Sequence, residues 1–577
     1  MSINETVRSR YAAWLESPVV SEAEKEELRA ICDDEKEIEF RFASYLSFGT
    51  AGLRGTIKAG TNAINTHTVA HATQGLANYI KKQGGESRRG VAIAYDCRTN
   101  SEELAATSAA VLTAAGIPVY LFDALRPTPV LSFAVLHLHC IAGINITASH
   151  NPKQYNGYKV YWEDGAQISG DIAKAISAEI AAVDLFRDVS RMNAEEAAAC
   201  GLRHTIGSEI DAQYLEHVMA QTVNPDAVRR VADSLSVVYT PLYGTGAKLV
   251  PEILRRIGIR RLYTVDEQML PDGTFPSVPF PNPEYPEAFT MGIEIAERVG
   301  SDLVIATDPD ADRVGIMARA EDGTFRTVTG NQMGCLLLDY IITALRQQNK
   351  LPEGAYAVKS LVSTAMADRI AADHGVRMFN VYTGFKFIGS VISAEEARGC
   401  GGFLLGFEES YGYLRGNYAK DKDAVVATML ICEMAAYYAD RGMTLCDALE
   451  QLYRKYGYFK DGVDNIYMEG LDGLEKMKGV MTAFRNDPPH TLGGKAIASV
   501  HDYQNAVIHD FAHAKDVQTD DEPANMLRFE TAEGDAIIVR PSGTEPKIKF
   551  YYLCSGKTAE EAVEKSEAFA KDMKALL

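Results

Sequence analysis

The chain has 577 residues, of which 46% are hydrophobic and 24% charged, and its formal net charge is −20. Because one hydrophobic core rarely serves more than about 250–300 residues, this length predicts several domains, with about four as the starting expectation. The composition is that of a folded globular protein, and no apolar run reaches the roughly 20 residues of a membrane span. An acidic excess of this size repels nucleic acid and anionic membranes, so we expect neither as a partner.

The N-terminus and the cysteines indicate a cytoplasmic location. The first residues, MSINETVRSRYAAWLES, lack the basic-then-apolar pattern of a secretion signal and are typical of a polar amphipathic helix. Nine cysteines are scattered along the chain without a CxxC pair. This spacing favours reduced thiols over a disulfide framework.

Short apolar strands alternate with helical patterns over most of the chain. Strand-like segments occur at 90–96, 117–123, 235–242, 302–308 and 355–362, and polar or glycine-rich residues follow each of them. The alternation predicts α/β units, in which ligands bind beyond the carboxyl ends of the strands.

The C-terminal part has a different pattern. Strand-like segments at 536–543 and 547–554 lie close together and precede a long amphipathic helical stretch, which predicts a smaller α+β domain. The segment 265–286 holds six prolines and is expected to form an ordered loop inside the second domain.

Four segments combine groups that suit phosphate or metal. The first, NITASHNPKQYNGYKVY (145–161), places Ser149 on a polar loop after an apolar stretch, beside His150. A hydroxyl there could act as a nucleophile or phosphate carrier if a neighbouring group reduces the cost of the charge. Serine, asparagine and proline are also common turn formers, so this segment alone could be an ordinary polar turn.

The second segment, TDPDADR (307–313), directly follows the predicted strand DLVIA. Its aspartates, Asp308, Asp310 and Asp312, recur at every second position, so a tight loop can direct three carboxylates at one point. Such charges repel one another unless a cation lies among them, and oxygen ligands suit a hard ion such as Mg²⁺. The loop lacks the glycine and glutamate of an EF-hand, and the alternative is a solvated acidic turn.

The third and fourth segments contain groups for binding a sugar and a phosphate. LLGFEESYGY (404–413) places an acidic pair and a hydroxyl between glycines at the end of an apolar strand, where carboxylates can accept hydrogen bonds from sugar hydroxyls; an exposed turn explains it equally well. In VRPSGTEPKIKF (539–550), arginine, serine, glycine and threonine make a compact anion-binding loop, although the GxxxxGK[ST] pattern of a P-loop is absent. Together the four segments supply the parts of phosphoryl transfer on a sugar phosphate.

In this order and spacing, the motifs TASHNPKQYNGYK, TDPDADR, GFEESYG and RPSGTEPK resemble those of the α-D-phosphohexomutase superfamily, specifically its long phosphoglucomutase branch. The resemblance covers nearly the whole chain. It implies four domains around a central cleft, three of them related α/β domains with mixed sheets and the last a smaller α+β domain. We expect their boundaries near 1–206, 207–321, 322–455 and 456–577.

The resemblance also implies an activity and a ligand set. The protein would interconvert α-D-glucose 1-phosphate and glucose 6-phosphate through a phosphoserine, with glucose 1,6-bisphosphate as intermediate and activator. Ser149 would carry the phosphoryl group, and Mg²⁺ would be held by that phosphate with Asp308, Asp310 and Asp312. The positions matched to catalytic residues of the family are Arg54, His150, Lys159 and Arg313. Those matched to residues that bind the substrate are Lys359, Thr383, Gly384, Phe385, Glu408, Ser410, Lys422, Arg540, Ser542, Gly543 and Thr544.

Some features depart from the family or leave alternatives open. Phe385 stands where family members often carry tryptophan or histidine, and an extension without a predicted function precedes SFGTAGLRG (47–55). The GFEESYG loop favours glucose, with a phosphomannomutase, a phosphopentomutase and a glucose 1,6-bisphosphate synthase as alternatives. Rivals of other classes are a phosphatase and an inactive sugar-phosphate-binding protein. The expected partners are sugar phosphates, and the expected state is a monomer or homodimer.

Overall fold

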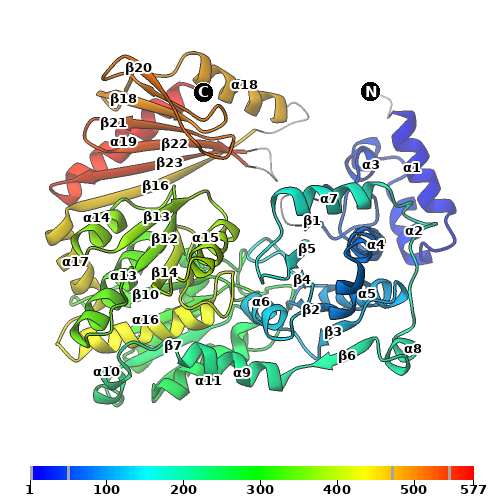
Figure 1. Cartoon of the computed structure of the whole chain (residues 1–577), viewed down its shortest axis with the longest axis horizontal. Helices are drawn as coiled ribbons and strands as arrows, with labels where there is room; N and C mark the ends of the chain where they lie inside the picture. Colours follow the sequence, from blue (N-terminus) through cyan, green and yellow to red (C-terminus); the bar gives the residue numbers. More distant parts are fainter. Residues whose placement is uncertain (1–3, 49–51, 469–472, 543–546) are drawn as a thin grey trace.

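The computed structural model describes residues 4–48, 52–468, 473–542 and 547–577. Its strands form four sheets that follow one another along the chain, and each sheet with its helices makes one unit: the first, second, third and C-terminal units. Figure 1 shows the units along an arc, with the N-terminal helices and the C-terminal sheet at its two ends.

The elements of the first unit are β1 (Gly52–Thr56), α4 (Thr66–Lys82), η1 (Gly84–Arg89), β2 (Val91–Tyr95), α5 (Ser101–Ala114), β3 (Val119–Phe122), α6 (Thr128–His137), β4 (Ala142–Ile146), β5 (Tyr155–Trp162), α7 (Gly170–Ala181), α8 (Ala194–Ala199) and β6 (Arg203–Ile206). Those of the second are α9 (Ser208–Met219), α10 (Pro225–Arg230), β7 (Ser236–Thr240), α11 (Gly246–Ile257), β8 (Arg261–Thr264), η2 (Asp266–Gln268), η3 (Pro286–Phe289), α12 (Thr290–Val299), β9 (Leu303–Thr307), β10 (Val314–Arg319) and β11 (Phe325–Val328).

The elements of the third unit are α13 (Gly330–Gln347), β12 (Tyr356–Ser360), α14 (Met366–Asp373), β13 (Arg377–Val381), α15 (Phe385–Ala397), β14 (Phe403–Glu408), β15 (Gly412–Leu414), α16 (Ala424–Ala439) and α17 (Leu445–Tyr456). Those of the C-terminal unit are β16 (Tyr458–Tyr467), α18 (Gly473–Asn486), β17 (Thr491–Leu492), β18 (Lys495–Asp502), β19 (Val507–Asp510), β20 (Lys515–Gln518), β21 (Leu527–Thr531), β22 (Ala536–Pro541), β23 (Lys547–Gly556) and α19 (Ala559–Ala575).

The first three sheets share a core of four strands. A central strand (β2, β7 or β12) has a parallel neighbour on each side. The later of these neighbours (β4, β9 or β14) then turns back into an antiparallel partner (β5, β10 or β15). The C-terminal sheet is instead antiparallel at each described pairing. The structure therefore confirms three related mixed α/β units and a C-terminal unit of different fold.

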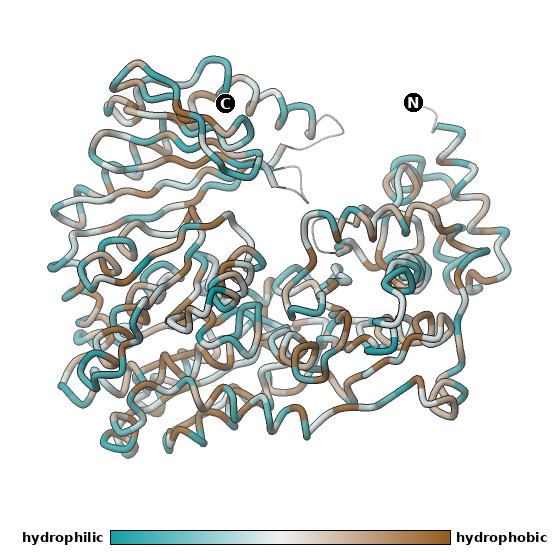
Figure 2. Tube along the Cα trace, in the orientation of Figure 1, coloured by the Kyte–Doolittle hydropathy of each residue, from teal (hydrophilic) through white to brown (hydrophobic). Residues whose placement is uncertain are grey.

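The central strands are apolar because helices cover both faces of each sheet. Every residue of β2, β7 and β9 is buried. In β2, Ala92 and Ala94 pack into one core while Val91 and Ile93 pack into another on the opposite face. A parallel sheet covered in this way needs apolar side chains on both sides, which removes the alternation seen in half-exposed strands. Figure 2 shows the same distribution, with hydrophobic stretches inside the units.

The second sheet extends past residue 321, where we expected the second domain to end. β11 pairs with β10 in an antiparallel hairpin, so it belongs to this sheet.

None of the helices in the described ranges has the length and apolar character that a membrane span requires. All nine cysteines are described, and none forms a disulfide.

Three helices precede the first unit: α1 (Glu5–Glu16), α2 (Glu22–Arg29) and α3 (Glu35–Phe42). Trp14 is 1% exposed and its ring meets those of His67 and Phe186 edge-on, with centroids 5.1 and 5.6 Å away. Together with Ala59 and Leu185 of the first unit, the helices enclose a small hydrophobic core. The extension is therefore packed onto the first unit rather than separate from it.

Candidate active site

The candidate site lies where the three equivalent hairpins turn. The turns are the serine loop (147–154, between β4 and β5), the acidic loop (308–313, between β9 and β10) and the sugar loop (409–411, between β14 and β15). Thr128 N–H donates to the Asp310 carbonyl at 2.8 Å, and Val314 N–H donates to the Tyr411 carbonyl at 3.1 Å. These contacts tie the first unit to the second and the second to the third.

Each turn contains one non-glycine residue in the left-handed region of backbone space. The φ angles are +52° at Ser149, +48° at Ala311 and +67° at Tyr411. Such backbone costs of the order of 1–3 kcal/mol and persists where the surroundings impose it, which happens often at active sites. The strain is therefore repeated at the same place in three related hairpins.

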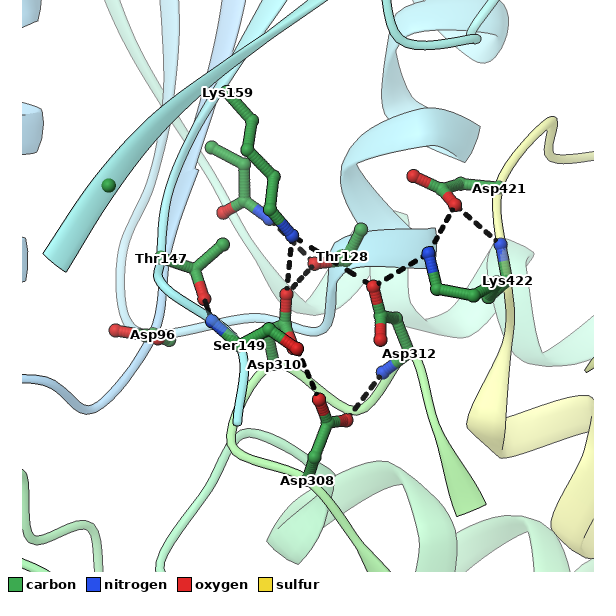
Figure 3. Close-up of polar contacts among 12 residues, drawn as sticks. Asp96, Thr128, Thr147, Ser149, Lys159, Asp308, Asp310, Asp312, Asp421 and Lys422 are labelled. Atoms are coloured by element: carbon green, nitrogen blue, oxygen red, sulfur yellow. Dashed lines mark hydrogen bonds and ion pairs between the residues drawn. The ribbon is translucent and has the colours of Figure 1, made fainter. Parts of the chain in front are cut away.

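The Ser149 hydroxyl points into the acidic loop (Figure 3). Its Oγ donates to Asp308 Oδ2 at 2.6 Å, and His150 Nδ1 lies 3.1 Å from Ser149 Oγ. The residue is 3% exposed, and its N–H donates to Thr147 Oγ1 at 2.8 Å. Burial, and then the charges of Arg313 and Arg54, lower the pKa of His150 well below its usual value, so the imidazole is neutral at pH 7.

The three aspartates of the acidic loop form one buried cluster. Each is at most 2% exposed, and one ligand atom from each lies within 4.8 Å of the others. Burial and the two neighbouring carboxylates raise the pKa of Asp308 well above its usual value. The N–H groups of Asp312 and Arg313 donate to Asp308 Oδ1 at 3.1 and 3.0 Å, which fixes that carboxylate within the turn.

Two lysines of other units supply counter-charges to this cluster, in addition to Arg313 of the acidic loop, whose Nε lies 3.8 Å from Asp312 Oδ1. Lys159 on β5 places Nζ 2.9 Å from Asp310 Oδ2 and 3.9 Å from Asp312 Oδ2. Lys422, in the segment before α16, places Nζ 3.1 Å from Asp312 Oδ2. The matched lysines thus flank the acidic loop from two sides, as Figure 3 shows.

Two oxygens of the cluster fit a metal ion. Asp310 Oδ1 and Asp312 Oδ1 are buried and accept no hydrogen bond from any described group. Buried carboxylate oxygens normally have a partner, and a hard cation is one that three converging carboxylates can bind. The acidic cluster is therefore compatible with a metal site.

The two matched arginines lie beside the serine loop. Arg54 on β1 is paired in register with Gly157, and its NH1 lies 3.5 Å from Asn151 Oδ1. Arg313 donates from NH1 to Glu284 Oε1 at 2.8 Å. Glu284 belongs to the proline-rich segment 265–286, so this loop contributes a side chain to the site.

The structure brings together most residues matched to sugar binding. The Gly384 N–H donates to Glu408 Oε1 at 2.7 Å, which joins the segment 383–385 to the end of β14. Phe385 is buried at the start of α15, and Lys422 Nζ lies 5.6 Å from the centre of its ring. Thr383 Oγ1 is buried without a hydrogen-bond partner among the described residues, so it is available for a hydrogen bond with a ligand. Ser410 is half-buried and lies in the sugar loop, two residues after Glu408, the last residue of β14.

Lys359 lies on β12 within the third unit. Its Nζ is 3.1 Å from Asp368 Oδ2 and donates to the Ser363 carbonyl at 3.3 Å. Burial lowers the pKa of this lysine. Both contacts stay within the third unit, so they do not join Lys359 to the serine loop or the acidic loop.

Two of the matched phosphate-binding residues are described: Arg540 lies near the end of β22 and Ser542 directly after it. Arg540 is half-buried and faces Lys549 in register, and Ser542 N–H donates to the Lys547 carbonyl at 2.8 Å. Gly543 and Thr544 lie outside the described residues. The described part of the loop thus gathers cationic side chains on two neighbouring strands.

The motifs did not identify several residues that hold the site together. Asp421 accepts hydrogen bonds from Tyr161 at 2.7 Å, Gln167 at 3.0 Å and Lys422 Nζ at 3.0 Å, so it orients that lysine. Arg98 donates to backbone carbonyls of the serine loop. A signal was present in both cases: Arg98 follows a predicted strand at its carboxyl end, and Asp421 lies in the charged run KDKD before an apolar helix.

Comparison with known proteins identifies the family. Models of the phosphoglucomutase/phosphomannomutase family match the chain at 45–187 (alpha/beta/alpha domain I), 212–323 (domain II), 329–456 (domain III) and 494–569 (C-terminal domain). A phosphoglucomutase of Staphylococcus epidermidis is 38% identical over 516 residues, covering 88% of this chain and 91% of the relative. One of Staphylococcus aureus is 36% identical over 543 residues, covering 93% and 95%.

The fold agrees with that of a solved structure from the family. The open form of the Paramecium phosphoprotein parafusin, a phosphoglucomutase, superposes with a TM-score of 0.66 at 18% identity, covering 92% of this chain and 95% of that one. At this identity the likeness concerns the fold alone. From the family models and the curated relatives, the chain belongs to the phosphoglucomutase/phosphomannomutase family and is a phosphohexomutase, an isomerase of carbohydrate metabolism.

Proposed function

We propose that the protein interconverts α-D-glucose 1-phosphate and glucose 6-phosphate through a phosphorylated Ser149 and glucose 1,6-bisphosphate. The observation that carries the proposal is the 2.6 Å contact between Ser149 Oγ and Asp308 Oδ2. It joins the hydroxyl of one unit to the carboxylate cluster of the next, which is the pairing that phosphoryl transfer to and from a serine needs.

In the proposed reaction, phosphorus leaves Ser149 Oγ and bonds to the free hydroxyl oxygen of the sugar phosphate. The proton of that hydroxyl passes to a nearby base, for which the neutral His150 is a candidate, while Ser149 Oγ takes up a proton as it is released; Lys159 is a further candidate for proton transfer. The bisphosphate then reorients, and the phosphorus of its other phosphate bonds to Ser149 Oγ; the serine hydroxyl gives up its proton, and the sugar oxygen that is released takes one up. Arg54 and Arg313 would contact the phosphoryl group during both transfers.

The acidic cluster suits Mg²⁺, for which we propose Asp308, Asp310, Asp312 and an oxygen of the Ser149 phosphate as ligands. The fit depends on the buried Oδ1 atoms of Asp310 and Asp312, which accept no hydrogen bond from the described part of the chain. Bound there, Mg²⁺ would offset negative charge on the transferring phosphoryl oxygens. Lys159 and Lys422 would neutralise the remaining charge of the carboxylates, because both approach the opposite oxygens, Oδ2 of Asp310 and of Asp312.

The rest of the substrate would be held at two places. Glu408 and Ser410, with the segment 383–385, are proposed to bind sugar hydroxyls. Arg540 and Ser542, with Gly543 and Thr544, are proposed to bind the phosphate that is not reacting. Because the bisphosphate presents either end in turn, this second site must accept both phosphates, and a bidentate arginine can do so.

The preferred sugar is proposed from the GFEESYG loop and from the names of the relatives. The decisive assay compares kcat/KM on glucose, mannose, glucosamine and ribose 1-phosphates, with inorganic phosphate measured in parallel. Glucose 1-phosphate should give the highest kcat/KM and negligible inorganic phosphate. A higher value for mannose or ribose would move the assignment to a phosphomannomutase or phosphopentomutase, and accumulation of inorganic phosphate to a phosphatase.

For the location we propose the cytoplasm, in keeping with nine unpaired cysteines.

A further inference from the structure

Arg98 lies just beyond the carboxyl end of β2, beneath the serine loop. Its side chain is 0% exposed. The guanidinium donates to four backbone carbonyls of the segment 149–155: from NH2 to Ser149 and Asn151, and from NH1 at 3.0 Å each to Pro152 and Tyr155. One buried cation thus donates to four carbonyls in and directly after the turn that carries the proposed nucleophile.

A second set of contacts fixes the guanidinium itself. Its Nε lies 3.4 Å from Asp96 Oδ2, and that carboxylate also accepts the Arg98 N–H at 2.9 Å and the Ser101 hydroxyl at 2.7 Å on Oδ1. The Phe275 ring, from the proline-rich segment of the second unit, lies 5.2 Å from Arg98 Cζ. The guanidinium is therefore held between a buried carboxylate and an aromatic face.

The second unit covers this arrangement closely. A Cβ added at Gly273 would come within 2.5 Å of Thr99 N and 2.8 Å of the Cys97 carbonyl oxygen. Backbone therefore packs directly on backbone over the segment 97–99, with no room for a side chain between them. Water has no access to the guanidinium, which donates to all four carbonyls; that of Pro152 also accepts the Tyr155 N–H at 3.0 Å.

We propose that Arg98 is the positioning residue of the serine loop. It holds the backbone of residues 149–155 so that Ser149, at a strained φ of +52°, directs Oγ at Asp308 Oδ2. The proposal rests on Ser149 being the phosphoryl carrier. Arginine suits this role because its planar guanidinium presents five donors in a fixed fork, whereas lysine has three donors around one nitrogen and cannot reach four carbonyls in the same way.

The role separates binding from chemistry. Arg98 is buried behind the loop, so its loss should leave the groups that grip the substrate in place. A shift of about 1 Å at the reacting oxygen can lower the rate about 100-fold. Substitution should therefore lower kcat strongly and change KM little.

Arg89 provides a matched control at the other end of the same strand. It ends η1, immediately before β2, and donates to the carbonyls of His139 at 2.8 Å and Cys140 at 3.2 Å. It is thus an arginine that also holds backbone carbonyls of the first unit, at the amino end of β4 instead of the carboxyl end. Arg89→Lys makes the same chemical change away from the serine loop.

The experiment compares Arg98→Lys, Arg89→Lys and the unmodified chain in kcat, KM, Tm and hydrogen exchange of the peptide 147–158. For Arg98→Lys we expect kcat to fall about 10- to 100-fold, KM to stay within about threefold, and exchange of that peptide to rise. For Arg89→Lys we expect kcat and exchange at 147–158 to stay unchanged, whatever the loss in Tm. Equal kcat in the two lysine variants, or unchanged exchange at 147–158 in Arg98→Lys, would overturn the proposal.

A second variant covers the case in which Arg98→Lys fails to fold. Asp96→Asn keeps Arg98 and the shape of its partner but removes the ion pair that orients the guanidinium, so it should give a smaller fall in kcat with the same unchanged KM. Unaltered kcat in a folded Asp96→Asn protein counts against the proposal. A wrong mutase assignment gives a different result from a wrong positioning role. In the first case the unmodified chain shows no isomerisation, while hydrogen exchange of peptide 147–158 still differs between Arg98→Lys and Arg89→Lys.

Discussion

Ser149 of the first unit and Asp308 of the second, 159 positions apart, share a hydrogen bond of 2.6 Å between Oγ and Oδ2. Each lies in the turn after the same strand of its unit, β4 in one sheet and β9 in the other. The related topology of the units therefore accounts for the meeting of these residues, because equivalent hairpins turn toward a common point. The following predictions start from this contact.

Replacement of Ser149 by alanine should remove mutase turnover by several orders of magnitude, because the serine loop has no other hydroxyl 2.6 Å from the acidic cluster. Intact-mass analysis of the purified protein should find phosphate on Ser149 and at no other residue of the site. Ser177→Ala serves as the control, since that hydroxyl donates to the Ala173 carbonyl within α7. Full activity of the Ser149 variant would disprove its assignment as carrier.

Removal of Mg²⁺ should abolish activity and lower Tm, since the charges of three buried carboxylates are then offset by Lys159, Lys422 and Arg313 without the divalent ion. Treatment with EDTA, followed by added Mg²⁺, measures both effects, and added metal should restore them. Asp308→Asn should lower the affinity for Mg²⁺, so that more of the ion is needed to restore activity. Asp322→Asn, in the exposed turn between β10 and β11, should behave like the unmodified chain. Turnover that survives chelation would rule out the metal site.

Arg540, proposed to bind the phosphate that is not reacting, and Glu408, proposed to bind sugar hydroxyls, should respond differently to substitution. Arg540→Ala should raise KM for the sugar phosphate steeply and release more bisphosphate, because substrate and intermediate both need that contact. Arg540→Lys keeps the charge but loses the fork, so it should recover part of the loss. Glu408→Gln keeps the shape of the side chain and should mainly change the ratio of kcat/KM between glucose and mannose 1-phosphates.

Steady-state kinetics on both sugars, with the released bisphosphate quantified, test this division. Normal KM in Arg540→Ala would contradict the phosphate role, and an unchanged glucose-to-mannose ratio in Glu408→Gln would contradict the sugar role. The two outcomes are independent, since the residues lie on different units.

The stability of the C-terminal strand β16 should depend on pH through Asp461. Burial raises the pKa of Asp461 to about 7, against a smaller opposing effect of Thr364 and Lys359. The folded state therefore favours the protonated acid, and this contribution to stability is present at low pH and is lost as the pH rises through about 7. Asp461→Asn should raise Tm by about 3 °C or more at pH 8.5 relative to the unmodified chain and give a smaller gain at pH 5, because the loss of stability builds up between the ordinary carboxyl pKa and about 7.

Differential scanning calorimetry at both pH values measures the effect. Asp464→Asn on the same strand is the control, because Asp464 pairs with Lys574 at 3.0 Å and should gain nothing from losing its charge. Equal Tm differences at pH 5 and 8.5 for Asp461→Asn would contradict the prediction.

Much of the fold and of the site follows from local sequence. The apolar runs that end in polar loops predicted the α/β units, because a strand covered by helices on both faces has to be apolar and its carboxyl end has to carry the polar groups. Ser149, the three aspartates and Glu408 each lie at such an end, within a few residues of a strand. The resemblance to the family added the order of the units and the roles of lysines and arginines outside the motifs.

Tertiary structure decided how these local pieces combine. The strand patterns do not reveal that β11 belongs to the second sheet, that Glu284 reaches Arg313 from the proline-rich segment, or that Asp421 orients Lys422 from a charged run. Nor does any local signal show that Arg98 holds the serine loop from beneath. The contacts of Arg313 with Glu284 and of Arg98 with the serine loop span 29 and 54 positions of the chain, and a buried charge finds such a partner only when the units pack together. The sequence by itself determined which groups could act, because loop chemistry and strand periodicity are local; only the packed units decided which of them meet.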